Sequence, residues 1–120
     1  MEFATLISHL LHSRTQIHIF HWQTTSFAEH MALNTYYDEI VELIDGLVES
    51  YQGKYGIVTG YSNYKLIEYK GNNQTIAYLE QLYEVVYNMY NSTEDTYIQN
   101  QLDGVTELIR STIYKLKNLN

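Results

Sequence analysis

The stretch "QTTSFAEHMALNTYYDEIVELIDGLVES", residues 23–50, contains a helix stop followed by a helix start. Ser26 is a good N-cap residue, and Glu29 three residues later predicts a capping box. The helix that follows, from Phe27 to about Gln52, has two distinct faces. Its apolar face comprises Leu33, Tyr36, Tyr37, Ile40, Leu43, Ile44, Leu47 and Tyr51. Its other face carries a stripe of potential metal ligands: His30, Asn34, Asp38, Glu42, Asp45 and Glu49.

Three further segments show the three- and four-residue spacing of apolar residues that is typical of amphipathic helices. These segments are residues 2–25, residues 75–90, and the residues from the turn "NSTED" (91–95) to about Leu119. The chain has no proline, and four of its six glycines fall within residues 53–71. Because proline is the strongest helix breaker, long uninterrupted helices are expected outside that region.

Residues 53–73 interrupt the helical pattern with glycine and asparagine. Within them, "YKLIEYK" (residues 64–70) is either a short helix or an extended piece that lies across the bundle. Such a segment connects helices that are not antiparallel neighbours, as long crossovers do in some bundles. We therefore predict an all-α protein with one domain over residues 1–120. Its fold is an antiparallel four-helix bundle with a crossover between the second and third helices.

Composition excludes several classes of function. Seven Lys and Arg against fourteen Asp and Glu give a formal net charge of −7, and Arg14 is the only basic residue among the first 53. Nucleic-acid binding is not expected, because phosphate contacts require a basic surface. The absence of cysteine excludes disulfides, thiolate chemistry and iron–sulfur clusters. No signal-peptide or transmembrane run is recognisable, so we expect a cytoplasmic protein without membrane association.

All five histidines lie in the first 30 residues, and three of them are concentrated in residues 16–30. Residues 31–120 contain none, so a pseudo-symmetric centre built from Glu-x-x-His pairs on facing helices is not expected. Any site containing histidine must come from the first helix and the start of the second. We expect His9 and His12 to be solvent or interface residues, and His18 to lie on the same side as His21.

The segments "QIHIFHWQ" (16–23), "SFAEH" (26–30) and "LIDGLVES" (43–50) resemble the Dps-like miniferritins of the ferritin-like superfamily. The matching positions are His21-Trp22, His30, Asn34, Asp45 and Glu49. The resemblance implies a ferritin-like bundle in which two histidines and an acid come from one subunit. An Asp-x-x-x-Glu pair then comes from a two-fold related subunit. Such sites hold iron while peroxide or oxygen oxidises it, and members of the family commonly form hollow dodecamers.

The sequence departs from this pattern in ways that bear on activity. Asn34 stands where the family has an acid, which removes a charge that would hold Fe²⁺. Asp38, one helical turn further on, is the candidate substitute. The loop between Trp22 and His30 is three residues shorter than usual in the family, and the chain lacks the basic tail that some members use to bind DNA. The predicted metal ligands are therefore His21, His30, Asp45, Glu49 and Asp38.

Simpler interpretations stand beside this one. His21 and His30 could be capping or interface residues, and Trp22 an interface or core anchor. The acidic stripe is by default a solvated face, since buried carboxylates without a cation repel one another and take up protons.

Three functions follow from these alternatives. The first is a Dps-like homo-oligomer, at least a dimer, that binds and oxidises iron at a subunit interface. The second is a catalytically silent bundle that kept the fold and lost the metal, which Asn34 favours. The third is a helical adaptor whose acidic face meets a basic partner, since fold alone does not decide function.

Overall fold

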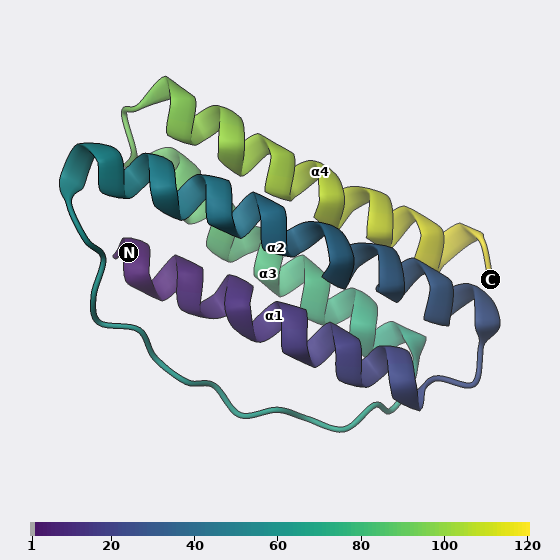
Figure 1. Cartoon of the computed structure of the whole chain (residues 1–120). Coiled ribbons are helices and arrows are strands. Elements are labelled where there is room, and N and C mark those ends of the chain that lie inside the picture. Colours follow the sequence, from purple (N-terminus) through teal and green to yellow (C-terminus); the bar gives the residue numbers. More distant parts are fainter. Residues whose placement is uncertain (1) are drawn as a thin grey trace.

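The computed structural model describes residues 2–120 and contains four helices (Figure 1). These are α1 (Phe3–Gln23), α2 (Phe27–Tyr55), α3 (Asn72–Ser92) and α4 (Thr96–Asn118). They lie along the long axis of a molecule that measures 44 × 25 × 20 Å. The prediction of an all-helical chain with four helices is confirmed. The sequence pattern placed the end of α2 slightly too early and the start of α3 slightly too late.

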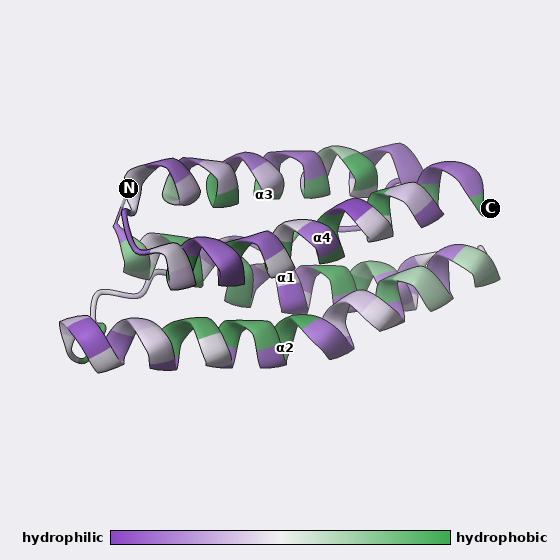
Figure 2. Ribbon diagram, turned by 90° about the horizontal axis from the view of Figure 1, so that it is seen from above, coloured by the Kyte–Doolittle hydropathy of each residue, from purple (hydrophilic) through white to green (hydrophobic). Residues whose placement is uncertain are grey.

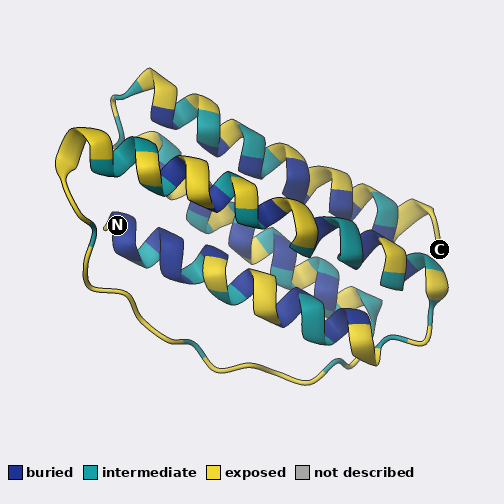
Figure 3. Ribbon diagram, viewed as in Figure 1, coloured by how far each residue is buried: buried dark blue, intermediate teal, exposed yellow. Residues whose placement is uncertain are grey.

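The core lies along the axis shared by the helices. α1 packs on α2 and α3, and α4 also packs on α2 and α3, so each helix has two neighbours. The inner faces are apolar and buried, whereas the outer faces are polar and exposed (Figures 2 and 3). The largest fully buried side chains include Phe20, Leu33, Tyr36, Ile40, Leu47, Leu79, Ile98 and Leu102. Because each buried side chain of this size contributes about 1.5–3 kcal/mol, burial of these faces is the main force holding the bundle together.

One tyrosine in this core needs a polar partner. The hydroxyl of Tyr36 lies 2.7 Å from Ser13 Oγ, which itself donates to the backbone oxygen of Leu10 at 2.7 Å. Ser13 has only one proton, so Tyr36 donates to it. Complete burial raises the pKa of Tyr36, which keeps the phenol neutral.

Residues 56–71 form neither helix nor strand and run beside α1 along the length of the bundle (Figure 1). The segment leaves α2 through Gly56, whose φ of 91° lies in the left-handed region that favours glycine. "YKLIEYK" is therefore an extended piece and not a short helix.

Side-chain amides of α1 hold this segment in place. Gln16, fully buried, donates to the backbone oxygen of Ile67 and accepts from its N–H, both at 2.8 Å. Gln23 accepts from the N–H of Tyr69 at 2.8 Å. An extended backbone that no strand pairs with must find other partners, and these glutamines supply them.

The turn between α1 and α2 confirms one half of the predicted capping box. Ser26 Oγ accepts from the N–H of Glu29 at 3.2 Å. The other half was wrong, because the N–H of Ser26 donates to Thr24 Oγ1 at 3.2 Å. The carboxylate of Glu29 is instead buried, and it accepts from Tyr69 Oη at 2.7 Å and Thr24 Oγ1 at 2.9 Å. A buried carboxylate needs donors, and these hydroxyls supply them.

None of the helices formed by residues 2–120 carries an apolar stretch long enough for a bilayer crossing.

Candidate functional site

His21 and His30 form a stacked pair at the turn between α1 and α2. Their ring centroids are 3.6 Å apart and their planes differ by 18°. The Nδ1 atom of His21 lies 2.7 Å from the backbone oxygen of His30, and that of His30 lies 2.8 Å from the backbone oxygen of His21. A carbonyl oxygen can only accept, so each Nδ1 carries a proton. In the neutral form of each ring, the lone pair of Nε2 is then available.

This tautomer is the one that metal-binding histidines use. Such residues usually donate their other ring N–H to a backbone carbonyl or a carboxylate, which fixes the ring and raises the basicity of the ligating nitrogen. The short turn explains why the pair forms. His21 lies in the last turn of α1 and His30 in the first turns of α2, and the cap at Ser26 aligns the two helix ends. Sequence reasoning paired these two histidines, and the structure brings them together.

A chain of polar contacts connects the pair to Asp38. Tyr37 Oη lies 3.4 Å from His21 Nε2 and donates to Asn34 Oδ1 at 2.8 Å. Asn34 Nδ2 then donates to the Asp38 carboxylate at 2.9 Å. Asp38 is exposed and reaches the histidines only through these two residues. Partial burial, followed by the negative charge of Asp38, raises the pKa of Tyr37.

An aromatic column lies beside the pair. His18 stacks on Tyr37 with centroids 3.9 Å apart and an angle of 17°, and Trp22 covers His18 at 4.2 Å. Partial burial lowers the pKa of His18. His18 therefore packs against the site on the same side as His21, as the spacing predicted. Trp22 is 67% exposed, so it is not a core anchor.

Two other large apolar side chains are exposed at the start of α2. Phe27 is 76% exposed and Met31 is 48% exposed. Together with Trp22 they form what we call the apolar rim of the histidine pair. Exposed aromatic side chains gathered around a polar site are typical of surfaces that contact a partner.

Asp45 and Glu49 are not brought to the histidines within one chain. Both are exposed on α2, and Asp45 is about 22 Å along the helix from His30 at a rise of 1.5 Å per residue. The whole stripe of Asp38, Glu42, Asp45 and Glu49 is solvated. Within residues 2–120, no three side chains of His, Cys, Asp or Glu lie together in a group that could hold a metal ion. One chain therefore offers two imidazoles with correctly placed protons, and carboxylates must come from elsewhere to complete a ligand set.

His9 and His12 serve a different purpose from the one expected. His9 stacks on Tyr64 with centroids 4.2 Å apart and an angle of 9°, and His12 meets the edge of the same ring at 5.9 Å. They line a cavity of about 250 Å³ between α1, α3 and the extended segment. Burial lowers the pKa of both histidines. They are packing residues for residues 56–71 rather than free surface residues.

Sequence reasoning missed Tyr37, which it counted with the apolar face of α2. With His30 placed at 0°, Tyr37 falls at about 340°, so the two side chains are only about 20° apart around the helix. A tyrosine at the border between an apolar face and a polar stripe can direct its hydroxyl to the polar side. The position of Tyr37 at this border is therefore the feature of the sequence that could have identified it as a site residue.

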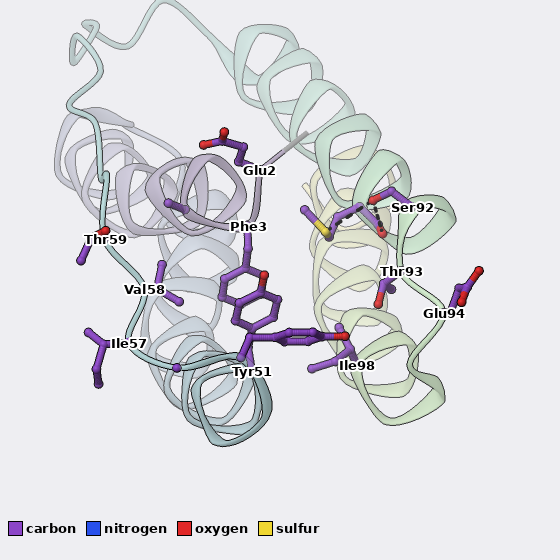
Figure 4. A pocket seen from close by; sticks show the side chains of 14 residues that line it. Glu2, Phe3, Tyr51, Ile57, Val58, Thr59, Ser92, Thr93, Glu94 and Ile98 are labelled. Atoms are coloured by element: carbon purple, nitrogen blue, oxygen red, sulfur yellow. Dashed lines mark hydrogen bonds between the residues drawn. The ribbon is translucent and has the colours of Figure 1, made fainter.

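The opposite end of the bundle contains a larger cavity, of about 700 Å³, which the sequence did not predict (Figure 4). Phe3 and Tyr51 stack there almost in parallel, 3.7 Å apart. The remaining lining is mostly aliphatic or hydroxylic, and Glu2 and Glu94 lie at its margin. No histidine lines this cavity, and nothing there matches the hydrogen-bonded order of the histidine pair.

Comparison with known proteins gives one family. A family model described as "Family of unknown function (DUF5856)" matches residues 21–116, which include the histidine pair and most of the bundle. No curated protein and no solved structure matches the chain.

Proposed function

The chain belongs to the DUF5856 family, and we propose that it is a ferritin-like, Dps-type protein that binds iron between two copies of itself. One observation carries this proposal. His21 and His30 each donate from Nδ1 to the other's backbone, which leaves both Nε2 atoms free to bind a metal. The ferritin-like form of the bundle, with a crossover between α2 and α3, is part of the proposal. The course of residues 56–71 beside α1 supports it (Figure 1).

The donor set suits iron but needs a second chain. Imidazole nitrogen and carboxylate oxygen are both ligands that iron accepts, and oxidation requires an open coordination position. His21 and His30 provide the nitrogens, while Asp45 and Glu49 of a second copy provide the carboxylates. Asp38 stays close enough to contribute through Asn34.

A second copy is the occupant that best fits this surface. The apolar rim of Trp22, Phe27 and Met31 would be covered by it. The solvated stripe on α2 supplies acidic side chains to the same contact, so one surface carries both the imidazoles and the carboxylates that complete them. A two-fold axis would form two identical sites per dimer, because each chain gives both halves. A dodecamer is the larger assembly that the resemblance implies.

Iron is the substrate in this proposal, and ferrous iron gives up an electron to oxygen or peroxide once it is held. Asn34 leaves the site with less negative charge than an acid would, so we propose weak binding and slow oxidation. The alternative is a silent bundle that uses the same surface for protein contact. Asn34 favours that alternative, since its amide is already engaged by Tyr37 and Asp38.

Isothermal titration calorimetry with Co²⁺ under anaerobic conditions tests the proposal. Co²⁺ replaces Fe²⁺ because it is not oxidised during the measurement. We expect binding that disappears in the double variant His21→Ala/Asp45→Ala while the helix content by circular dichroism stays nearly unchanged. Ferric absorbance after addition of Fe²⁺ in air then measures oxidation, and the mass in solution measures assembly. Equal binding by the double variant and the parent would remove the site from these residues.

A further inference from the structure

Two acceptor atoms face each other at the centre of the candidate site. They are His21 Nε2 and Tyr37 Oη, 3.4 Å apart. Nε2 carries a lone pair because the proton of the neutral ring is on Nδ1, where it is donated to the backbone oxygen of His30. The direction of the Tyr37 hydroxyl hydrogen therefore decides whether these two atoms form a hydrogen bond.

Asp38 fixes the direction of this hydrogen by orienting the side chain of Asn34. An ionised carboxylate can only accept, so the Asn34 side chain must turn its NH₂ group toward Asp38, at 2.9 Å. This orientation turns Asn34 Oδ1 toward Tyr37. The phenol hydrogen goes to that oxygen, which is 2.8 Å away, rather than to the more distant His21 Nε2. The oxygen of Tyr37 thus presents a lone pair to another lone pair, with no hydrogen between them.

A cation bound between the two atoms would remove the repulsion between their lone pairs. Two ligand atoms bound about 2.1 Å from one metal ion, at an angle of about 90–110°, lie about 3.0–3.4 Å apart, which includes the observed separation. We infer that Tyr37 is a metal ligand next to His21, and this inference rests on the proposed iron site. On binding, the O–H bond of Tyr37 breaks, an oxygen–metal bond forms, and the proton leaves to solvent.

A phenolate also accounts for the residue at position 34. Binding through the Tyr37 oxygen supplies a negative charge from the chain that lost an acid at Asn34. Asn34 is then a positioning residue of the metal-free chain, because it accepts the Tyr37 O–H from its place between Tyr37 and Asp38. This hydrogen bond is given up when the proton leaves and the oxygen binds the metal. Stacking against His18 fixes the phenol ring itself.

The test uses the optical signature of a phenolate bound to ferric iron. Fe³⁺ is supplied to the full chain as its nitrilotriacetate complex, and the visible charge-transfer band and the tyrosinate modes in resonance Raman spectra are recorded. We expect the wild-type protein and the control Tyr87→Phe, an exposed tyrosine on α3, to show both signals. Tyr37→Phe keeps the ring that stacks on His18, so it folds normally, but it loses both signals. Its apparent Kd for Co²⁺ rises by about tenfold or more.

The outcomes separate the two proposals. Co²⁺ binding that depends on His21, with no phenolate signal and no loss of affinity in Tyr37→Phe, would overturn the role of Tyr37 and leave the iron site standing. No Co²⁺ binding by the wild-type protein would overturn both. A phenolate signal that persists in Tyr37→Phe would assign the ligand to another tyrosine and also overturn the inference.

Discussion

The two histidine clusters, one on α1 and one across the turn between α1 and α2, use the same side chain in opposite ways. At His9 and His12 the rings pack against Tyr64, and the cluster fixes the extended segment to the bundle. At His21 and His30 the rings stack on each other, and backbone carbonyls determine which nitrogen holds the proton. In this chain, the neighbouring histidines that qualify as candidate ligands are those whose Nδ1 atoms are already bonded to backbone oxygens.

The largest expected difference between the two histidine clusters is in how much a substitution weakens metal binding. His21→Ala removes a ligating nitrogen and the carbonyl-bonded ring, so we expect Co²⁺ binding to weaken by about 100-fold or more. His12→Ala, the matched control in the packing cluster, should bind Co²⁺ as the wild-type protein does. Isothermal titration calorimetry measures both, and equal losses in the two variants would contradict the contrast.

The next effect is on stability and concerns the packing cluster alone. Tyr64→Ala removes the ring that His9 and His12 both contact and should lower the free energy of unfolding by about 1–2 kcal/mol. Urea denaturation followed by circular dichroism measures this loss. Co²⁺ affinity should stay unchanged, and a large fall in affinity would show that the two clusters are not independent.

A smaller effect concerns pH. The pKa values of His9 and His12 are lowered by burial, so the unfolded chain takes up protons before the folded chain does. Above the ordinary histidine pKa of 6.5, His9 and His12 are neutral in both states and do not favour unfolding. Below it, the unfolded chain binds protons more readily, so the folded protein loses stability as the pH falls. We expect the urea midpoint to decrease between about pH 7.5 and about pH 5, and the variant His9→Gln/His12→Gln to decrease less steeply. An equal slope in both proteins would assign the acid sensitivity to other groups.

The smallest effect we predict is at position 34. Asn34→Asp restores the acid that the Dps-like pattern contains, so Co²⁺ should bind a few-fold more tightly. The new carboxylate lies one turn from Asp38, and repulsion between them should cost about 0.2–0.5 kcal/mol of stability. Calorimetry and urea denaturation measure the two quantities. Weaker binding by Asn34→Asp would argue that the amide, through its hold on Tyr37, is worth more than the charge.

Local pattern was enough to predict the helices. Apolar spacing and the cap at Ser26 depend on residues close in sequence, so α1, α2, α3 and α4 follow from the sequence with small errors at their ends. The same pattern could not predict the partners of Glu29. Its donors include Tyr69, which only the folded chain brings next to the turn.

The candidate site also has features that nearby residues determine and features that distant residues or a second chain determine. The pairing of His21 with His30 depends on a short turn, and the resemblance to the Dps-like pattern predicted it. The packing of His9 on Tyr64 depends on a distant segment, and the spacing did not. Tyr37 lay at a border between two faces, where an angular count cannot assign a hydroxyl. The placement of Asp45 and Glu49 against the histidines depends on a second chain, and it remains a prediction.

The most direct test of the proposed site is anomalous diffraction from crystals of the full chain soaked in Co²⁺. We predict a cobalt peak bonded to His21 Nε2 and His30 Nε2, with Tyr37 Oη beside it and Asp45 and Glu49 of a second copy completing the ligand set. A fully occupied cobalt site elsewhere, with His21 and His30 still stacked and no second chain against them, would contradict it.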